Sequence, residues 1–278
     1  MSNYFEKAYH FLNRNKIDQR EEAFEKNRVN LVYWRKRVNL GDVICPVIVD
    51  WVLKQRGIDV NQEIASTQRL LSIGSVLDLG KFDATVWGSG LQSFRSVIDM
   101  YKRSPYRKLD IRSVRGPLTR QALTDCGYPC PEVYGDPGIL LPLIYPTQPE
   151  KKKDKREAYG VIHHHSSMPD CAGERTISIL TADHRRFVDE ITGCEKIISS
   201  SLHGIIFAES YGIPAVFLQQ KTNKEFIKYY DYYYSTGRYS VKVAHSLEEA
   251  LDMEPMVLPE LDDMRNNILN AFPYDLWE

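Results

Sequence analysis

Segments with strand character alternate with segments of helical character along most of this 278-residue chain, and this alternation constrains the fold most. The expected strands are short runs rich in aliphatic and β-branched residues, and most are followed by small or polar residues. They cover residues 29–38, 68–73, 84–87, 110–114, 159–163, 176–180, 196–199 and 214–218. Helices are expected over residues 43–55, 117–126, 183–192, 204–211 and 258–270. Strands that alternate with helices favour sheets covered by helices, so the sequence predicts an α/β protein.

A charged stretch without apolar periodicity, residues 149–157, divides the chain into two parts. Such segments are typical of domain boundaries. We therefore expect two Rossmann-like, doubly wound lobes, at residues 29–150 and 151–257. An amphipathic helical segment is expected at residues 1–28, and residues 258–278 are expected to form a C-terminal helix that could pack back on the first lobe.

Composition excludes several classes of protein. The chain has 36 basic and 37 acidic residues, a net charge of −1, so it lacks the basic excess of a nucleic-acid-binding protein. No apolar run resembles a signal peptide or a membrane span, and the five cysteines form no CxxC pair. These features predict a cytoplasmic protein with free thiols. The sequence has no HExxH, GxGxxG or P-loop motif, so we expect neither a metal nor a bound nucleotide cofactor.

Four turns follow expected strands and consist of small or polar residues: 39–42, 88–90, 115–117 and 199–204. In doubly wound folds, ligands bind where strands end and helices begin. Small residues let backbone N–H groups approach a ligand, and a helix N-terminus favours a phosphate or a carboxylate. For a single turn, however, the plain needs of a short connection explain small residues equally well.

The turn at residues 199–204 stands out, because it combines three serines with His203 where a helix begins. Capping that helix needs only one serine, so a functional site is the better interpretation. Histidine titrates near neutral pH and is the commonest general acid or base.

Other candidate residues lie outside this turn. In the run 163–165, alternation along a strand places His164 on the opposite face from its two neighbours, which argues against a three-histidine metal site. Arg115 could form a local salt bridge or hold an anion, and the sequence favours neither. Lys228 and Asp231 flank a tyrosine-rich run whose rings are expected mostly to pack, with one or two free to stack on a sugar.

At this point the residues resemble a known family, the polysaccharide pyruvyl transferases, and most closely its exopolysaccharide-biosynthesis branch. The resemblance rests first on the segment 199–214, Ser-Ser-Ser-Leu-His-Gly-Ile-Ile-Phe-Ala-Glu-Ser-Tyr-Gly-Ile-Pro. Six further motifs agree in the same order: residues 39–42, 87–90, 114–120 and 134–137, the strand into His164, and Lys228 with residues 231–233. The similarity spans about residues 30–240.

The resemblance implies a GT-B-like pair of Rossmann-type lobes with the active site in the cleft between them. It also implies that pyruvate moves from phosphoenolpyruvate onto two hydroxyls of a sugar, forming a ketal during exopolysaccharide or capsule biosynthesis. Phosphoenolpyruvate would be a co-substrate, with no further cofactor. The sugar acceptor could be carried by a lipid, which would bring the enzyme to the inner face of the membrane.

The resemblance also assigns roles to residues. Catalytic roles fall to His203 and His164. Donor binding is expected of Ser200, Ser201, Leu202, Gly204, Arg115, Lys228, Gly88 and Gly90, and acceptor binding of Asn39, Asp42, Asp136, Asp231 and Tyr232. Some members carry an arginine where this chain has Ser201, so Arg115, Lys228 or helix N–H groups would hold the donor phosphate instead. The family's usual Pro-His-Tyr is His-His-His here, so only His164 carries over.

Two other functions remain open from the sequence, because a fold does not fix a function. The first is a GT-B-type glycosyltransferase that uses a nucleotide-sugar donor. The second is a non-catalytic sugar-binding protein. Release of phosphate from phosphoenolpyruvate that depends on an added sugar would distinguish the pyruvyl transferase from both.

Overall fold

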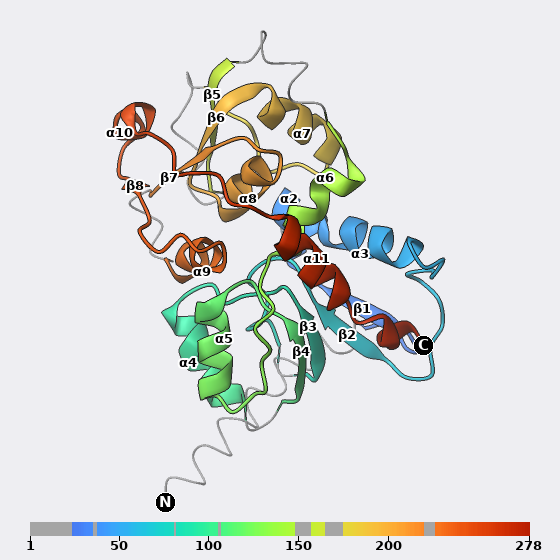
Figure 1. Cartoon of the computed structure of the whole chain (residues 1–278). Helices are drawn as coiled ribbons and strands as arrows, with labels where there is room; N and C mark the ends of the chain where they lie inside the picture. The colour runs from blue at the N-terminus through green and yellow to red at the C-terminus, as the bar shows by residue number, and fades with distance from the viewer. Residues whose placement is uncertain are drawn as a thin grey trace, which may run out of the picture.

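The computed structural model describes residues 24–35, 38–80, 82–104, 107–147, 157–164, 175–219 and 226–278. These residues form two four-stranded parallel sheets with helices around them (Figure 1). The first sheet contains β1 (Val29–Val32), β2 (Gln68–Leu71), β3 (Ala84–Trp87) and β4 (Leu109–Ser113). The second contains β5 (Glu157–Ile162), β6 (Cys194–Ser199), β7 (Ala215–Leu218) and β8 (Val243–Ala244). The prediction of an α/β fold is confirmed.

Helices occupy the connections. Before the second sheet they are α2 (Leu40–Val43), α3 (Cys45–Lys54), α4 (Phe94–Arg103), α5 (Pro117–Asp125), the 3-10 helix η2 (Pro137–Leu140) and α6 (Leu141–Ile144). After it begins they are α7 (His184–Thr192), α8 (Leu202–Ser210), α9 (Ile227–Ser235), α10 (Leu247–Asp252), α11 (Asp262–Asn270) and the 3-10 helix η4 (Tyr274–Trp277). In the described parts of the chain, no helix is long and apolar enough to cross a membrane.

Local sequence explains several of these boundaries. Pro117 begins α5, where the N–H that proline lacks would have no partner within the helix. Gly127, with a positive φ of 85°, follows the last turn of α5 and ends it. Ser93 caps α4 by accepting the N–H of Ser96. The sequence reading missed α4 and α9. Residues 1–23 of the expected N-terminal helix lie outside the described residues, as does most of the expected boundary at residues 149–157.

The two sheets wind differently. In the first, the strand order is β1-β2-β3-β4, and a parallel bridge from Val114 to Tyr134 continues it in the same direction. The reversal of strand order in a doubly wound sheet is therefore not found among these strands. In the second, Val161 of β5 pairs with Ile198 of β6 and also bridges to Thr176. The strand order therefore reverses at β5, which has Thr176 on one side and β6 on the other. Ligands in such sheets bind beyond the strand ends at this point.

The expected strand at residues 176–180 is reduced to that one bridge. The backbone leaves the sheet soon after this bridge. The carbonyl of Ile179 instead accepts a hydrogen bond of 2.8 Å from the N–H of Leu40. This bond ties the start of α2, which follows the first sheet's β1, to the segment beside β5. It therefore links the two sheets at their carboxyl ends.

The last part of the chain returns to the first sheet. Helix α9 packs on α5, and Asp231 accepts hydrogen bonds from the N–H and hydroxyl of Thr119. Figure 1 shows α11, in red, running between the two sheets. There the indole N–H of Trp87 donates to the carbonyl of Ile268 at 2.7 Å, and Arg112 of β4 pairs with Asp275. One apolar core, which includes Trp87 and Phe207, spans both halves and fixes the strand ends relative to each other.

Candidate active site

A pocket of about 420 Å³ opens where the carboxyl ends of strands from both sheets meet. The first half of the chain contributes residues of the β1–α2 turn, of the segment 74–79 after β2 and of the start of α4. The second half contributes His164 after β5, the first residues of α8 and Lys228 of α9. Seven of the expected site residues line it: Asn39, Asp42, His164, Ser201, Leu202, His203 and Lys228. The structure therefore brings together residues that lie almost 190 positions apart.

His203 lies at the wall of the pocket with Asp136 behind it. Its Nε2 is 3.5 Å from Oδ2 of Asp136, an ion-pair distance, and among the described residues neither atom has a hydrogen-bond partner. The ring stacks on Phe207. Burial disfavours the charge on Asp136, but the positive charge of His203, the N–H of Gly138 and the charge of Arg115 hold its pKa below the usual range. Asp136 therefore remains a carboxylate that can stabilise a protonated His203.

The turn at residues 39–42 shapes the space for that histidine. The side chain of Asn39 caps α2 by accepting the N–H of Gly41 at 3.1 Å. A Cβ atom on Gly41 would overlap the imidazole ring of His203, so only glycine leaves room for the ring. The motif thus has a structural role at Asn39 and Gly41, while Asp42 faces the pocket.

Asp42 is the titratable carboxylate next to His203. A Cβ atom built on Gly74 would lie 3.5 Å from Oδ1 of Asp42 and 3.7 Å from Cε1 of His203, so both side chains meet over this glycine. Burial raises the pKa of Asp42 to about 6, although the positive charges of His203 and Lys228 oppose the shift. Asp42 can therefore take up or release a proton near neutral pH.

The other end of the wall favours anions. Ser201 is the N-cap of α8, but its side chain makes no capping hydrogen bond to a described residue, so the first N–H groups of the helix are not covered by it. Nζ of Lys228, itself buried, lies 3.3 Å from Nε2 of His164. A lysine and a helix N-terminus together give this end of the pocket a positive potential.

Two expected donor-binding residues support the wall instead of lining the pocket. Oγ of Ser200 accepts the backbone N–H of His164 at 2.8 Å, which holds the end of β5 beside α8. A Cβ atom on Gly204 would overlap Oγ of Ser199 and crowd Ile162, so this glycine allows α8 to pack against β5.

Arg115 and Asp231 form an ion pair, which is one of the two roles that the sequence left open for the arginine. Both side chains are fully buried and form an ion pair at 3.2 Å, and Arg115 also donates to Oγ of Ser75 and to the carbonyl of Leu91. With a partner for each nitrogen, the guanidinium does not face the pocket. Its role is to hold Ser75, which does line the pocket, in place.

Four more residues that were expected to bind donor or acceptor lie behind the wall of the pocket. A Cβ atom on Gly90 would overlap the Arg115 guanidinium, and one on Gly88 would overlap Pro137. The hydroxyl of Tyr232, buried in α9, donates to Glu209 at 2.7 Å. Asp136 lies behind His203 and was expected to bind the acceptor. None of these four residues lines the pocket, and each supports groups behind its wall, so their expected contacts with substrate stay predictions.

Sequence reasoning also missed residues that line the pocket, chiefly Arg95 and Ser75. Arg95 lies in the first turn of α4 and is exposed. Ser93 as an N-cap followed by apolar residues at helical spacing was the signal that could have revealed α4. Among the described residues, no group of three His, Cys, Asp or Glu side chains could hold a metal ion.

Comparison with known proteins decides what this pocket belongs to. The sequence model of the family "Polysaccharide pyruvyl transferase" matches residues 39–222, from the Asn39 turn to beyond α8. The chain belongs to this family. Polysaccharide pyruvyl transferases are transferases, so the pocket is that of an enzyme of polysaccharide biosynthesis.

Two further similarities agree with the fold. An uncharacterized protein of Acanthamoeba polyphaga mimivirus is 27% identical over 225 residues, which is 74% of each chain. The crystal structure of a functionally uncharacterized protein from Klebsiella pneumoniae covers 79% of this chain and 93% of that chain, with a TM-score of 0.50. At 12% identity, the second similarity supports the arrangement of the backbone alone.

Proposed function

We propose that this pyruvyl transferase takes pyruvate from phosphoenolpyruvate and joins it to two hydroxyls of a sugar as a ketal. The observation that carries the proposal is the arrangement around His203. A buried carboxylate lies behind this histidine, a second carboxylate with a pKa of about 6 lies beside it, and a cationic end lies along the same wall. Proton transfer and anion binding are the two needs of this reaction.

The donor carries a phosphate and a carboxylate, so it needs cations and N–H donors. Lys228, which lies beside His164, and the first N–H groups of α8 supply them, and Arg95 adds a second cation from α4. Charge-assisted hydrogen bonds of this kind are about twice as strong as neutral ones. In this proposal they replace the arginine that some family members carry at the position of Ser201.

The reaction begins when His203 gives a proton to the methylene carbon of phosphoenolpyruvate, which becomes a methyl group and leaves the central carbon cationic. The first sugar hydroxyl attacks that carbon, and the C–O bond to phosphate then breaks, with the electron pair leaving on the phosphate. The second hydroxyl closes the ring. Of the two hydroxyl protons, one restores the proton that His203 gave, and the other leaves on the phosphate.

Asp42 is suited to take up the protons of the acceptor hydroxyls and to pass them on to His203 and to the phosphate. It faces the pocket, and with a pKa of about 6 it is mostly ionised at neutral pH yet basic enough to accept a proton in the transition state. Asn39 of the same turn also lines the pocket and offers an amide for a sugar hydroxyl. Asp136 acts through His203 as a positioning residue.

The decisive experiment follows inorganic phosphate. The full chain is incubated with phosphoenolpyruvate and a panel of sugars, nucleotide-sugars and lipid-linked sugars, and the product is examined by mass spectrometry for a mass increase of one pyruvate ketal. We expect release that depends on the acceptor. Glycosyl transfer from a nucleotide-sugar, without phosphate release from phosphoenolpyruvate, would refute the proposed donor and support the glycosyltransferase alternative.

A further inference from the structure

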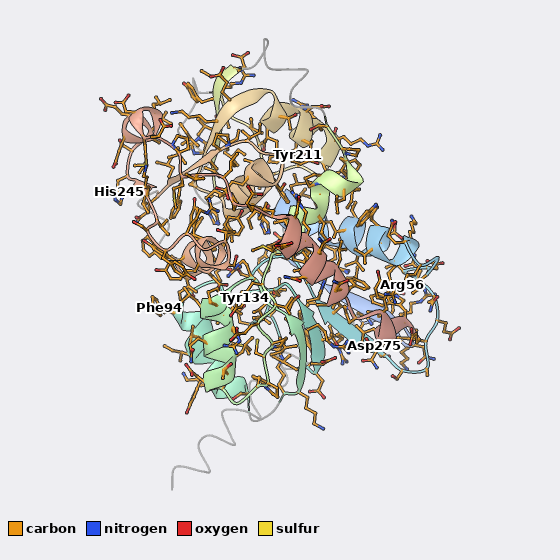
Figure 2. The ribbon with its side chains drawn as sticks, viewed as in Figure 1. Arg56, Phe94, Tyr134, Tyr211, His245 and Asp275 are labelled. Carbon is orange, nitrogen blue, oxygen red and sulfur yellow. The ribbon has the colours of Figure 1, made fainter. Side chains whose placement is uncertain are left out.

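Helix α4 exposes a row of large apolar side chains to solvent. Phe94, Ile98 and Tyr101 are 74%, 54% and 65% exposed. Their spacing of four and three residues places them along one side of the helix. Figure 2 shows Phe94 at the outer edge of the first lobe, where α4 begins. Hydrophobic residues exposed singly are normal, but a contiguous row is typical of a binding surface.

A second exposed apolar segment lies at the same pocket. Trp34 lines the pocket together with Arg95 of α4 and is 37% exposed, and Val38, which precedes the pocket residue Asn39, is 50% exposed. The other large apolar residues that are exposed in the described parts of the chain, Leu143, Tyr239 and Val257, lie in separate elements. Five of the exposed large apolar residues therefore lie in two segments that also contribute residues to the pocket.

Cations border this apolar surface. Arg95 and Lys102 are exposed, seven residues apart, and lie beside the row of α4 on the side that faces the pocket. Arg35 is exposed next to Trp34. The one acid in α4, Asp99, is half-buried and lines the pocket. A bulky apolar face flanked by Lys and Arg is the pattern of helices that lie in a membrane interface, where the cations meet anionic headgroups.

We propose that this surface, Trp34, Arg35, Val38 and the exposed side of α4, docks on an anionic lipid bilayer with the pocket mouth facing the headgroups. A second copy of the chain fits less well. A two-fold interface through α4 would place the same cations of both copies close together, with no exposed acid of that helix to balance them. A lipid surface supplies the negative charge that the row lacks.

The docking explains how the enzyme would reach its acceptor. A sugar carried on a lipid stays at the bilayer surface, and an enzyme docked through the mouth of its pocket meets it there. This consequence rests on the proposed function, because it assumes a sugar acceptor. The docking itself does not, since it depends only on the surface of α4 and its neighbours.

The test is co-sedimentation of the full chain with vesicles of phosphatidylcholine and phosphatidylglycerol at a ratio of three to one. We expect binding that is weaker with pure phosphatidylcholine and weaker at 0.5 M salt. The double variant Phe94→Ser/Ile98→Ser should lower the vesicle affinity by about tenfold or more. Arg95→Gln/Lys102→Gln should lower it by about 25-fold, since each cation near an anionic surface contributes roughly fivefold.

The matched control is Tyr239→Ser/Val257→Ser, which removes two side chains of similar exposure, 70% and 86%, from other elements. It should bind vesicles as the wild type does. Equal binding by all variants, or no binding by the wild type, would overturn the proposal. So would light scattering that shows a dimer which Phe94→Ser/Ile98→Ser converts to a monomer, since the row would then serve a second copy.

Phosphate release with a water-soluble acceptor separates this proposal from the proposed function. Phe94 and Ile98 do not line the pocket, so Phe94→Ser/Ile98→Ser should keep wild-type turnover of a soluble sugar and lose turnover of a lipid-linked one. If pyruvyl transfer fails with every acceptor while vesicle binding persists, the proposed function is wrong and the docking surface stands. Circular dichroism confirms that each variant is folded.

Discussion

Two buried ion pairs of this protein join an acid to a base across the sequence, and they differ in how completely their atoms are bonded. Arg115 and Asp231 are fully buried, and every nitrogen of the arginine side chain has a partner. His203 and Asp136 are 3.5 Å apart, and the facing atoms lack a hydrogen-bond partner among the described residues. The saturated pair holds α9 against α5, whereas the unsaturated pair opens on the pocket. Unsatisfied hydrogen-bonding atoms beside the pocket therefore distinguish the reactive pair from the structural pair.

Among the changes to these two pairs, replacing His203 should have the largest effect on activity. His203→Gln should lower acceptor-dependent phosphate release by about 10²–10⁴-fold, the usual effect of one general acid or base. The free energy of unfolding should change by less than about 1 kcal/mol, because the glutamine amide can face the buried Asp136 carboxylate in place of the imidazole. His245→Gln, at an exposed histidine outside the pocket, is the control (Figure 2). A large loss of stability in His203→Gln would make the pair structural after all.

The saturated pair should behave in the opposite way. Asp231→Ala leaves the buried Arg115 without its carboxylate and should reduce the free energy of unfolding by about 3–5 kcal/mol in urea. Asp275→Ala, which removes a half-exposed partner of Arg112, should cost at most about 1 kcal/mol. The double variant Arg115→Met/Asp231→Leu should lose less stability than the sum of the single changes. A result for Asp231→Ala as small as that of the control would contradict the assignment.

Gly41 leaves the room that the His203 ring of the reactive pair occupies. Gly41→Ala should displace the His203 ring and lower activity by about 100-fold, as a 1 Å misplacement can do. Gly57→Ala is the control: its φ of 70° strains an alanine, but no atom lies within 4 Å of the new Cβ. That variant should lose stability and keep its activity. Wild-type activity in Gly41→Ala would show that the ring is not confined by the turn.

The pH dependence of stability and activity tests the role of Asp42 in the pocket. Its folded pKa is about 6 and its ordinary value is 3.8, so burial disfavours the ionised form. Ionisation therefore destabilises the fold increasingly as pH rises from about 4 to 6. Asp42→Asn should gain about 1–3 kcal/mol at pH 8 and nothing at pH 4, while activity falls. Wild-type activity should decline as pH falls through about 6. Urea unfolding at both pH values checks the first prediction, and the absence of any gain at pH 8 would refute it.

Much of the fold could be read from local patterns. The run Ala84–Trp87 was predicted with its observed limits, and α5 and α7 were placed to within one residue. These segments carry their own signals, such as Pro117 at a helix start. Helix α9 could not be found in this way, because Lys228 and Asp231 interrupt its apolar face. Both are buried through partners far along the chain, His164 and Arg115, which no local pattern shows.

The site divides in the same manner. His203, Asp42 and Lys228 were expected at the site and line the pocket, the first two because they belong to turns at strand ends. The motifs did not distinguish residues that touch the pocket from those that support it, such as Gly88, Arg115 and Asp231. That distinction depends on which way a side chain points and on what lies behind it. Arg95 was missed because its helix was not expected at all.

The bond from Leu40 to Ile179 and the seat that Gly41 provides for His203 have a consequence for how the enzyme is made. A ribosome that has added 200 residues has completed the first sheet, the β1–α2 turn and its empty seat, but not the histidine that occupies it. Arg115 waits longer still, until Asp231 emerges. A growing chain thus lacks a complete pocket for most of its synthesis, and the pocket forms only once α8 and α9 have packed onto strands that were made long before.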